Sequence, residues 1–257
     1  MKIIFIGDVF SSPGREIIKK KLPALREKFN PDFVFANVEN LSGGRGATDK
    51  NLREIKNAGV DFFTGGNHIF ERSEVFSGAF ADEIIRPANF PENCGGRGAA
   101  IFEKNDRRIL AINLSGRVFM KPNSIDCPFQ TFEKIWRKFK SEKFDAAILD
   151  FHAETTSEKA AMKFFADKKL SAIFGTHTHV GTIDAQISPA GTFFVSDVGM
   201  CGAENSLLGF SFESVWPRFF GEKTIFQTEK KAPPILNGYF LEIKNGRAIS
   251  FKKIREI

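Results

Sequence analysis

Short apolar runs alternate with helical segments along most of the chain, and this alternation restricts its fold more than any other feature. The apolar runs predict buried strands at 2–7, 32–37, 61–66, 107–113, 145–152, 170–177 and 192–197. The spacing of apolar residues predicts helices at 15–29, 48–59 and 157–169. The final segment, 237–254, alternates apolar and polar residues around Asn245 and Gly246, as in a β-hairpin with a type I′ turn. This order of elements predicts a layered α/β sandwich with one sheet that ends antiparallel.

The whole chain, 1–257, is predicted to form a single domain. No linker rich in Pro, Gly or Ser divides it, and no repeat of fixed period occurs. The stretch from about 199 to 234 has little periodicity, and we expect a long loop or a cap there. Thr48 is the expected N-cap of its helix, and Gly59 is the expected stop.

The net charge of +6 suits a partner that carries negative charge, such as a phosphate or a nucleic acid. The basic residues are scattered, however, and the runs at 19–21 and 252–253 are typical of solvated faces. No stripe of stacking aromatic residues and no standard nucleic-acid signature accompanies these runs. A nucleic-acid groove is therefore the weaker interpretation of the charge.

The three cysteines, Cys94, Cys127 and Cys201, are widely spaced and form no CxxC pair. This pattern argues against a disulfide framework and against a thiolate zinc site. The N-terminal apolar run is broken by Asp8, so a signal peptide is not expected, and no run approaches the ~20 apolar residues of a membrane span. A cytoplasmic protein with no membrane partner is the simplest expectation.

Residues that can bind metal ions follow the predicted strands at their carboxyl ends, where ligands bind in open α/β sheets. Taken singly, Asp8 and Asn67 are typical turn residues, and His152 is typical of an ordinary satisfied histidine. Taken together, the set includes all four histidines of the chain and only carboxylate, amide and imidazole ligands. We interpret it as a metal site. In chain order, the residues are Asp8, Glu39, Asn40, Asn67, His68, His152, His177 and His179.

The separation of His177 and His179 by one residue indicates two ions rather than one. In an extended strand, residues i and i+2 lie about 6.6–7 Å apart on one side, which is too far for one ion to take both rings easily. Two ions about 3.5–4 Å apart, as in two-metal hydrolytic sites, take one ring each. Of the two acids at these strand ends, Asp8 and Glu39, we favour Glu39 as the bridge between the ions. His68 directly follows Asn67, so it would lie beside the reacting group and could donate a proton to a leaving alkoxide.

Several long segments resemble one known family. They are GDVFSSPGR, VEN, GGNHIFE, RPANFPENCGGRG, NLSGRVFMKP, LDFHAETTSEKAA, FGTHTHVGT and DVGMCG, in order from residue 4 to about residue 215. With these segments the chain resembles the YmdB-like family of bacterial metallophosphoesterases, part of the calcineurin-like phosphoesterase superfamily. The resemblance implies a four-layer α/β/β/α sandwich with a dinuclear centre.

Position by position, the resemblance also implies roles for the residues at the strand ends. Glu39 bridges two metal ions, and His68 donates the proton while a hydroxide between the ions attacks the phosphorus. The family is associated with iron or manganese, with hydrolysis of 2′,3′-cyclic nucleotides and 3′,5′-cAMP, and with RNA metabolism. A protein of RNA metabolism is therefore a partner to consider. A second copy of this chain is a further partner to consider, independent of the resemblance. The implied ligands are Asp8, Asn40 and His179 for the first ion, and Asn67, His152 and His177 for the second.

Some loops depart from the family pattern, and alternatives stay open there. Ile69, Phe70 and Glu71 stand where Thr-Trp-Asp is frequent, so the substrate preference is less defined than the metal site. We interpret Arg45 as an ordinary exposed turn arginine. Arg97 is either another exposed turn arginine or a phosphate contact. The alternative to an enzyme is a regulatory nucleotide- or partner-binding protein of RNA metabolism with vestigial activity. A phosphomonoesterase or a nuclease on longer RNA would carry the same metal site, and the ligand types alone also suit cobalt or zinc.

Overall fold

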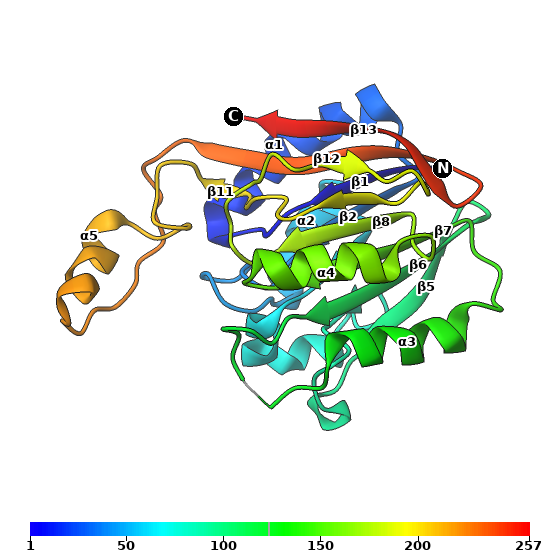
Figure 1. Ribbon diagram of the computed structural model, residues 1–257. Coiled ribbons are helices and arrows are strands. Elements are labelled where there is room, and N and C mark those ends of the chain that lie inside the picture. Colours follow the sequence, from blue (N-terminus) through cyan, green and yellow to red (C-terminus); the bar gives the residue numbers. More distant parts are fainter. Residues whose placement is uncertain (123) are drawn as a thin grey trace.

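A computed structural model describes residues 1–122 and 124–257, in which the strands form two β-sheets packed face to face (Figure 1). The first sheet has the order β11-β12-β1-β2-β3-β4, with β13 beside β12. Its strands are β1 (Lys2–Ile6), β2 (Phe33–Asn37), β3 (Phe62–Thr64), β4 (Ile84–Ile85), β11 (Gly202–Ala203), β12 (Pro234–Lys244) and β13 (Arg247–Glu256). The second sheet has the order β5-β6-β7-β8-β10-β9. Its strands are β5 (Ala99–Lys104), β6 (Arg107–Ser115), β7 (Ala146–His152), β8 (Ala172–Thr176), β9 (Gln186–Ile187) and β10 (Phe193–Val195).

Helices cover the outer face of each sheet. The α-helices α1 (Ser11–Phe29) and α2 (Asp49–Asn57) pack on the first sheet, and α3 (Pro128–Phe139) and α4 (Thr156–Ala166) pack on the second. A short helix, α5 (Phe212–Val215), and the 3₁₀ helices η1 (Asn67–Phe76), η2 (Glu92–Cys94) and η3 (Trp216–Phe220) lie in the connections. The predicted four-layer α/β/β/α sandwich is confirmed.

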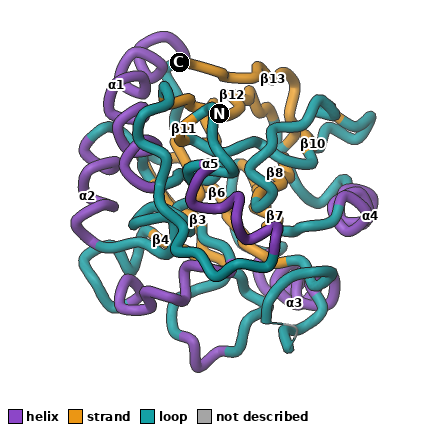
Figure 2. The backbone as a smooth tube through the Cα atoms, turned by 90° about the vertical axis from the view of Figure 1, so that its left-hand side faces the viewer, coloured by secondary structure: helices purple, strands orange, loops and turns teal. Residues whose placement is uncertain are grey.

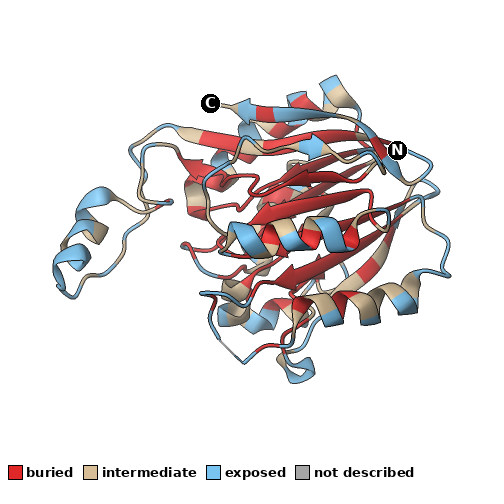
Figure 3. Cartoon of the chain, in the orientation of Figure 1, coloured by how far each residue is buried: buried red, intermediate tan, exposed pale blue. Residues whose placement is uncertain are grey.

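Three apolar layers hold the four structural layers together, and alternate residues of each central strand enter different ones. In β7, Leu149 and Phe151 face the helices, whereas Ile148 faces the other sheet. Phe5 of the first sheet stacks on Phe174 of the second with ring centroids 4.2 Å apart. Strands buried on both faces have nearly continuous apolar sequences, as these do. Figure 3 shows that the central strands of both sheets consist mostly of buried residues.

Most predicted elements are confirmed, including the C-terminal hairpin β12–β13. Asn245 and Gly246 have φ values of 51° and 74°, the positive values that a type I′ turn requires. The first sheet ends antiparallel, as expected, because β12 pairs antiparallel with β1; β5 pairs antiparallel with β6 in the second sheet too. Thr48 caps α2 by accepting a hydrogen bond from the backbone N–H of Asn51, also as expected.

Several elements differ from the prediction, among them the short strands β4, β9 and β11, which were not predicted. The first helix begins at Ser11 rather than Arg15, because Pro13 lies in its first turn, where the missing N–H costs no helical hydrogen bond. Helix α3 was not predicted, although Pro128 stands at its first position and its apolar face packs on β6. Strand β5 was not predicted either; it is an edge strand whose sequence begins with two alanines, a residue that is depleted in strands.

The stretch that was expected to be a loop or cap contains an arm, residues 204–233, that leaves the body after β11 and returns at β12. It carries α5 and η3 and projects from one side of the sandwich (Figure 1). Phe219 and Phe220 of the arm are 71% and 69% exposed. Across the described residues, no helix has the length and apolar character needed to cross a membrane.

A buried carboxylate, Asp150 on β7, joins the two sheets near the carboxyl ends of their strands. It accepts hydrogen bonds from Asn37 of β2 (2.8 Å), from Thr64 of β3 (2.5 Å) and from Thr176 of β8 (2.7 Å). Burial raises the pKa of the Asp150 carboxyl above its usual range, although His152 and these three donors oppose the rise. The apolar layer between the sheets therefore ends in a polar, fully hydrogen-bonded layer.

We expect Asp150→Ala to lower the free energy of unfolding by about 3 kcal/mol or more, because it leaves several buried donors without an acceptor. Urea denaturation of wild type and variant checks this. The matched control is Asp82→Ala, since the Asp82 side chain is 99% exposed; it should stay within about 0.5 kcal/mol of wild type. A similarly small effect for Asp150→Ala would show that the sheets do not depend on this residue.

Candidate metal centre

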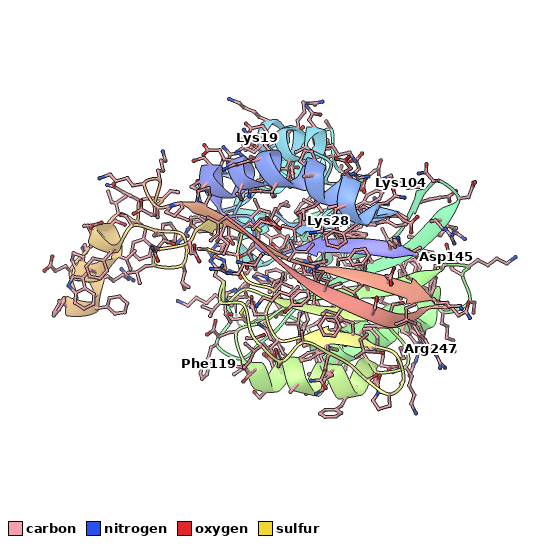
Figure 4. The ribbon with its side chains drawn as sticks, turned by 90° about the horizontal axis from the view of Figure 1, so that it is seen from above. Lys19, Lys28, Lys104, Phe119, Asp145 and Arg247 are labelled. Carbon is pink, nitrogen blue, oxygen red and sulfur yellow. The ribbon has the colours of Figure 1, made fainter. Side chains whose placement is uncertain are left out.

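All eight residues predicted for the site lie together, where the strands of both sheets end on the side of the arm. The opposite side is marked by Lys104, the last residue of β5, and by Asp145, which directly precedes β7 (Figure 4). Asp8 follows β1, Glu39 and Asn40 follow β2, and His152 is the last residue of β7. The loops after β3 and β8 contribute the rest, which are Asn67, His68, His177 and His179.

The ligand atoms form two groups that share Glu39. One group consists of Glu39, His152 and His177, the other of Asp8, Glu39 and His179, and within each group the atoms lie within 4.8 Å of one another. The two groups separate the same residues that the sequence analysis assigned to two different ions, and Glu39 belongs to both groups. The Glu39 carboxylate thus lies within reach of the histidines of both groups.

The two asparagines lie on opposite sides of this pair of groups. Asn40 Oδ1 is 3.1 Å from His179 Nε2, and Asn67 Oδ1 is 3.2 Å from His152 Nε2. Each amide oxygen therefore lies beside the group to which the sequence analysis assigned it. Amide oxygen, carboxylate and imidazole are ligands that divalent transition metals accept.

The argument from the spacing of His177 and His179 was wrong in its geometry, although the rings do lie in different groups. The chain is not extended here, since His177 and His179 have φ values of 99° and 66°. The left-handed backbone, rather than the i, i+2 distance along a strand, sends the two rings apart. Such a conformation costs about 1–3 kcal/mol in a residue other than glycine and is concentrated at functional sites.

Opposing charges dominate the electrostatics of the site. Burial lowers the pKa of His152, but the Glu39 and Asp8 carboxylates outweigh burial and raise it to about 9. Burial raises the pKa of Glu39, but His152 outweighs burial and holds it well below its usual range. Burial raises the pKa of Asp8 to about 6, while burial and the neighbouring His152 lower that of His177 to about 3. A cation placed among these groups would stabilise both carboxylates in their charged form.

The residues fit divalent metal ions on two further observations. Asp8 Oδ1 is buried and has no hydrogen-bond partner among the described residues, which is costly unless a cation or water binds it. Gly66, which begins the loop over the site, has no room for a side chain, because a Cβ there would overlap the Glu39 carboxylate and the His152 ring. The glycine thus lets the backbone close over the ligands without displacing them.

Outer contacts orient the two rings whose Nε2 atoms face the site. His152 Nδ1 lies 2.8 Å from Thr176 Oγ1, which donates its own hydrogen to Asp150. His179 Nδ1 donates to the backbone carbonyl of Leu208 in the arm, at 3.0 Å. Hydrogen bonds of this kind fix the tautomer and the direction of metal-binding histidines. His177 instead places Nε2 at 3.1 Å from Glu154 Oε2.

His68 lies at the rim of the site with a charged partner that the sequence analysis did not identify. Its backbone N–H donates to Glu39 Oε2 at 3.0 Å, and its ring Nδ1 lies 2.6 Å from Glu71 Oε1. Arg45 Nη1 donates to the same Glu71 oxygen at 3.2 Å. The i, i+3 spacing of His68 and Glu71 was the available signal. Arg45 is exposed, as expected, but it belongs to the surroundings of His68 rather than to an unrelated turn.

Two hollows meet at the site and share Arg45, His68 and His177. One, of about 410 Å³, extends from Glu39 and His179 to the arm, and the other, of about 820 Å³, extends to Phe119. Both volumes lie within the range of small-molecule sites.

Two other residues considered in the sequence lie outside these hollows. Arg97 donates to the backbone carbonyl of Asp82 at 2.6 Å, so the structure favours a structural contact over a phosphate contact. Cys201 is fully buried, and burial raises the pKa of its thiol to about 12. Neither residue takes part in the candidate site.

Known proteins resemble the chain over almost its full length. The sequence profile of a family described as YmdB-like protein matches residues 4–254. A 2′,3′-cyclic-nucleotide 2′-phosphodiesterase from Bacillus subtilis (strain 168) is 37% identical, with 99% of this chain and 96% of the relative covered. A putative phosphatase/phosphodiesterase from Mycoplasma pneumoniae is 36% identical, with 95% of this chain and 88% of the relative covered.

Solved structures agree with these relatives. The crystal structure of a phosphatase from Mycoplasma pneumoniae superposes with a TM-score of 0.92 at 35% identity, covering 100% of this chain and 93% of the other. That of a hypothetical protein from Thermus thermophilus superposes with a TM-score of 0.91 at 33% identity, covering 100% and 99%. A putative 5′-nucleotidase from Staphylococcus aureus (TM-score 0.58, 15% identity, 98% of this chain and 53% of that one) shares the fold alone. The four-layer sandwich, which the Mycoplasma pneumoniae phosphatase also has, is the calcineurin-like metallophosphoesterase fold expected from the sequence. From the profile match and the relatives above 30% identity, the chain belongs to the YmdB-like protein family.

Proposed function

We propose that the chain is a metal-dependent phosphodiesterase that hydrolyses small cyclic nucleotides, 2′,3′-cyclic nucleotides first and 3′,5′-cAMP second. The observation that carries this proposal is the pair of ligand groups that share Glu39, with His68 at their rim. The relative from Bacillus subtilis is named a 2′,3′-cyclic-nucleotide 2′-phosphodiesterase, which supports the choice of the 2′,3′-cyclic phosphate as the first substrate. A mere nucleotide-binding protein would not need His68 and Glu71 in hydrogen-bond contact beside the ligands.

We infer a dinuclear centre with iron or manganese, in which Asp8, Asn40 and His179 hold one ion and Asn67, His152 and His177 the other. Glu39 would contact both. When bound, the ions would supply Lewis acidity toward the phosphoryl oxygens and would acidify a water molecule. The protein contributes the fixed positions of the ligands, since Asp8, Glu39 and His152 are almost completely buried.

In this proposal His68 delivers a proton to the leaving oxygen of the substrate. Its Nδ1 is engaged by Glu71, so Nε2 is the nitrogen available to the substrate. The carboxylate of Glu71 fixes the direction of the ring, and Arg45 holds the carboxylate in place through a hydrogen bond. A poor leaving group, such as a ribose hydroxyl, depends on this proton.

We expect Glu39→Ala to lose both metal ions, because the two ligand groups have this carboxylate in common. Metal content after gel filtration, measured by mass spectrometry, checks this. Glu103→Ala, at a 65% exposed side chain of β5, is the control and should keep full metal content. If Glu39→Ala retains two full equivalents, Glu39 is not the bridge.

Manganese-loaded wild type should hydrolyse 2′,3′-cAMP, and His68→Ala should keep both ions but lose about 10²–10⁴-fold in kcat. The loss should be smaller for a p-nitrophenyl diester, whose leaving group needs no proton. Assays with 2′,3′-cAMP, 3′,5′-cAMP and a short RNA in parallel check the substrate class. Turnover of none of the three with two ions bound would exclude the phosphodiesterase, and a fall in metal content in His68→Ala would make His68 a ligand.

Glu71→Gln should lower kcat for 2′,3′-cAMP roughly 10-fold, part of the total that a positioned general acid contributes. The p-nitrophenyl diester should be much less affected, because Glu71 acts only through His68. Steady-state assays with both substrates measure this difference. The control is Glu74→Gln on the same 3₁₀ helix, which should leave the ratio of the two rates at the wild-type value. Equal losses on both substrates would mean that Glu71 only stabilises the loop.

A further inference from the structure

The cavity of about 410 Å³ is bounded by the metal centre at one end and by the arm at the other. Glu39, Asn40, His177 and His179 line the inner end. Seen from the side of the arm, α5 lies across the middle of the molecule (Figure 2). The arm residues that line the outer end are all apolar, namely Leu207, Leu208, Phe210, Val215, Phe219 and Phe226.

A continuous series of aromatic contacts joins the metal centre to this outer end. The Phe10 ring lies edge-on to the His179 ring with centroids 5.7 Å apart, and Phe210 lies edge-on to Phe10 at 4.8 Å. Phe226 follows at 5.2 Å from Phe210. The hydrogen bond from His179 to the Leu208 carbonyl ties the same segment to the metal centre. The apolar wall is therefore held at a fixed position relative to the ligands.

The helical part of the arm carries a cluster of aromatic rings around Trp216. Phe212, Phe219 and Phe220 pack on it, with ring centroids 5.0, 5.8 and 5.3 Å from that of Trp216. Of these rings only Phe219 lines the cavity, together with Val215, which lies four residues earlier. Phe219 is 71% exposed, so much of its ring is free of contacts within the chain. An exposed aromatic face that lines a cavity beside a phosphate-binding centre suits a flat, apolar ligand.

We propose that this cavity holds the nucleobase of the substrate, with Phe219 as the ring on which the base stacks. The inference rests on the proposed function, since it takes the phosphate of a nucleotide to lie on the metal centre. A nucleotide held there at its phosphate has its base within the same cavity, in contact with Phe219, Phe226 and Leu208. Because these side chains are apolar, they stack on any base without reading its edge, and the site accepts purines and pyrimidines alike.

The test compares two five-membered cyclic phosphates, 2′,3′-cAMP and glycerol 1,2-cyclic phosphate, of which the second lacks the base and most of the ribose. We expect Phe219→Ala to lower the ratio of kcat/KM for the nucleotide to kcat/KM for the base-free diester about 10-fold, through KM for the nucleotide. The matched control is Phe220→Ala, which removes a similarly exposed ring that also packs on Trp216 but does not line the cavity, and it should keep the wild-type ratio. An unchanged ratio in Phe219→Ala, or an equal fall in both variants, would overturn the base site.

A binding experiment separates failure of the base site from failure of the proposed function. Calorimetry with AMP should show binding about 10-fold weaker in Phe219→Ala than in Phe220→Ala, whether or not the protein hydrolyses a diester. If wild type hydrolyses neither cyclic phosphate, the proposed function fails, and the calorimetry alone decides on the base site. Equal AMP affinity in the two variants would reject that site even in an active enzyme.

Discussion

The hydrogen bonds of Asp150 connect the stability of the fold to the geometry of the site. Asp150 accepts from Asn37 and Thr64 of one sheet and from Thr176 of the other, so it fixes how the two sheets meet. The Thr176 hydroxyl that bonds to it also lies against His152 Nδ1 and leaves Nε2 facing Glu39 at 3.0 Å. A buried carboxylate is unfavourable by itself, and three donors offset that cost. The same residue therefore joins the layers and orients a candidate ligand.

The candidate centre concentrates unfavourable local features that the surrounding fold supports. Two histidines take left-handed backbone conformations, and Asp8 keeps one buried oxygen without a partner among the described residues. Carboxylates and imidazoles lie close together, and their mutual attraction shifts the pKa values of Glu39 and His152 in opposite directions. Strain and unsatisfied charge of this kind are expected where a bound cation completes the structure. The arm contributes to the centre and to the cavity beside it. Its Leu208 carbonyl accepts a hydrogen bond from His179, and its aromatic rings line the cavity.

The sequence was sufficient to predict the layers and the position of the site, because strand periodicity and strand-end residues depend on local spacing. Three of the four histidines belong to the candidate ligand groups, His68 lies at their rim, and Glu39 is common to the two groups. The sequence was not sufficient to predict contacts that arise from tertiary packing. Glu71 and Arg45 meet His68 only because two loops come together, and the backbone of His177 and His179 departs from the extended geometry that was assumed. The single domain, the cytoplasmic location, the partner from RNA metabolism and the homo-oligomer stay predictions.

Electron paramagnetic resonance of the protein loaded with Mn²⁺ tests the central claim that two ions share Glu39. Two Mn²⁺ ions joined through a carboxylate are exchange-coupled, so the account predicts a coupled spectrum whose hyperfine lines have half the spacing of an isolated ion, at two ions per chain. The coupled signal should be absent in Glu39→Ala. A spectrum of isolated ions only, or saturation at one ion per chain, would contradict the dinuclear centre and the function derived from it.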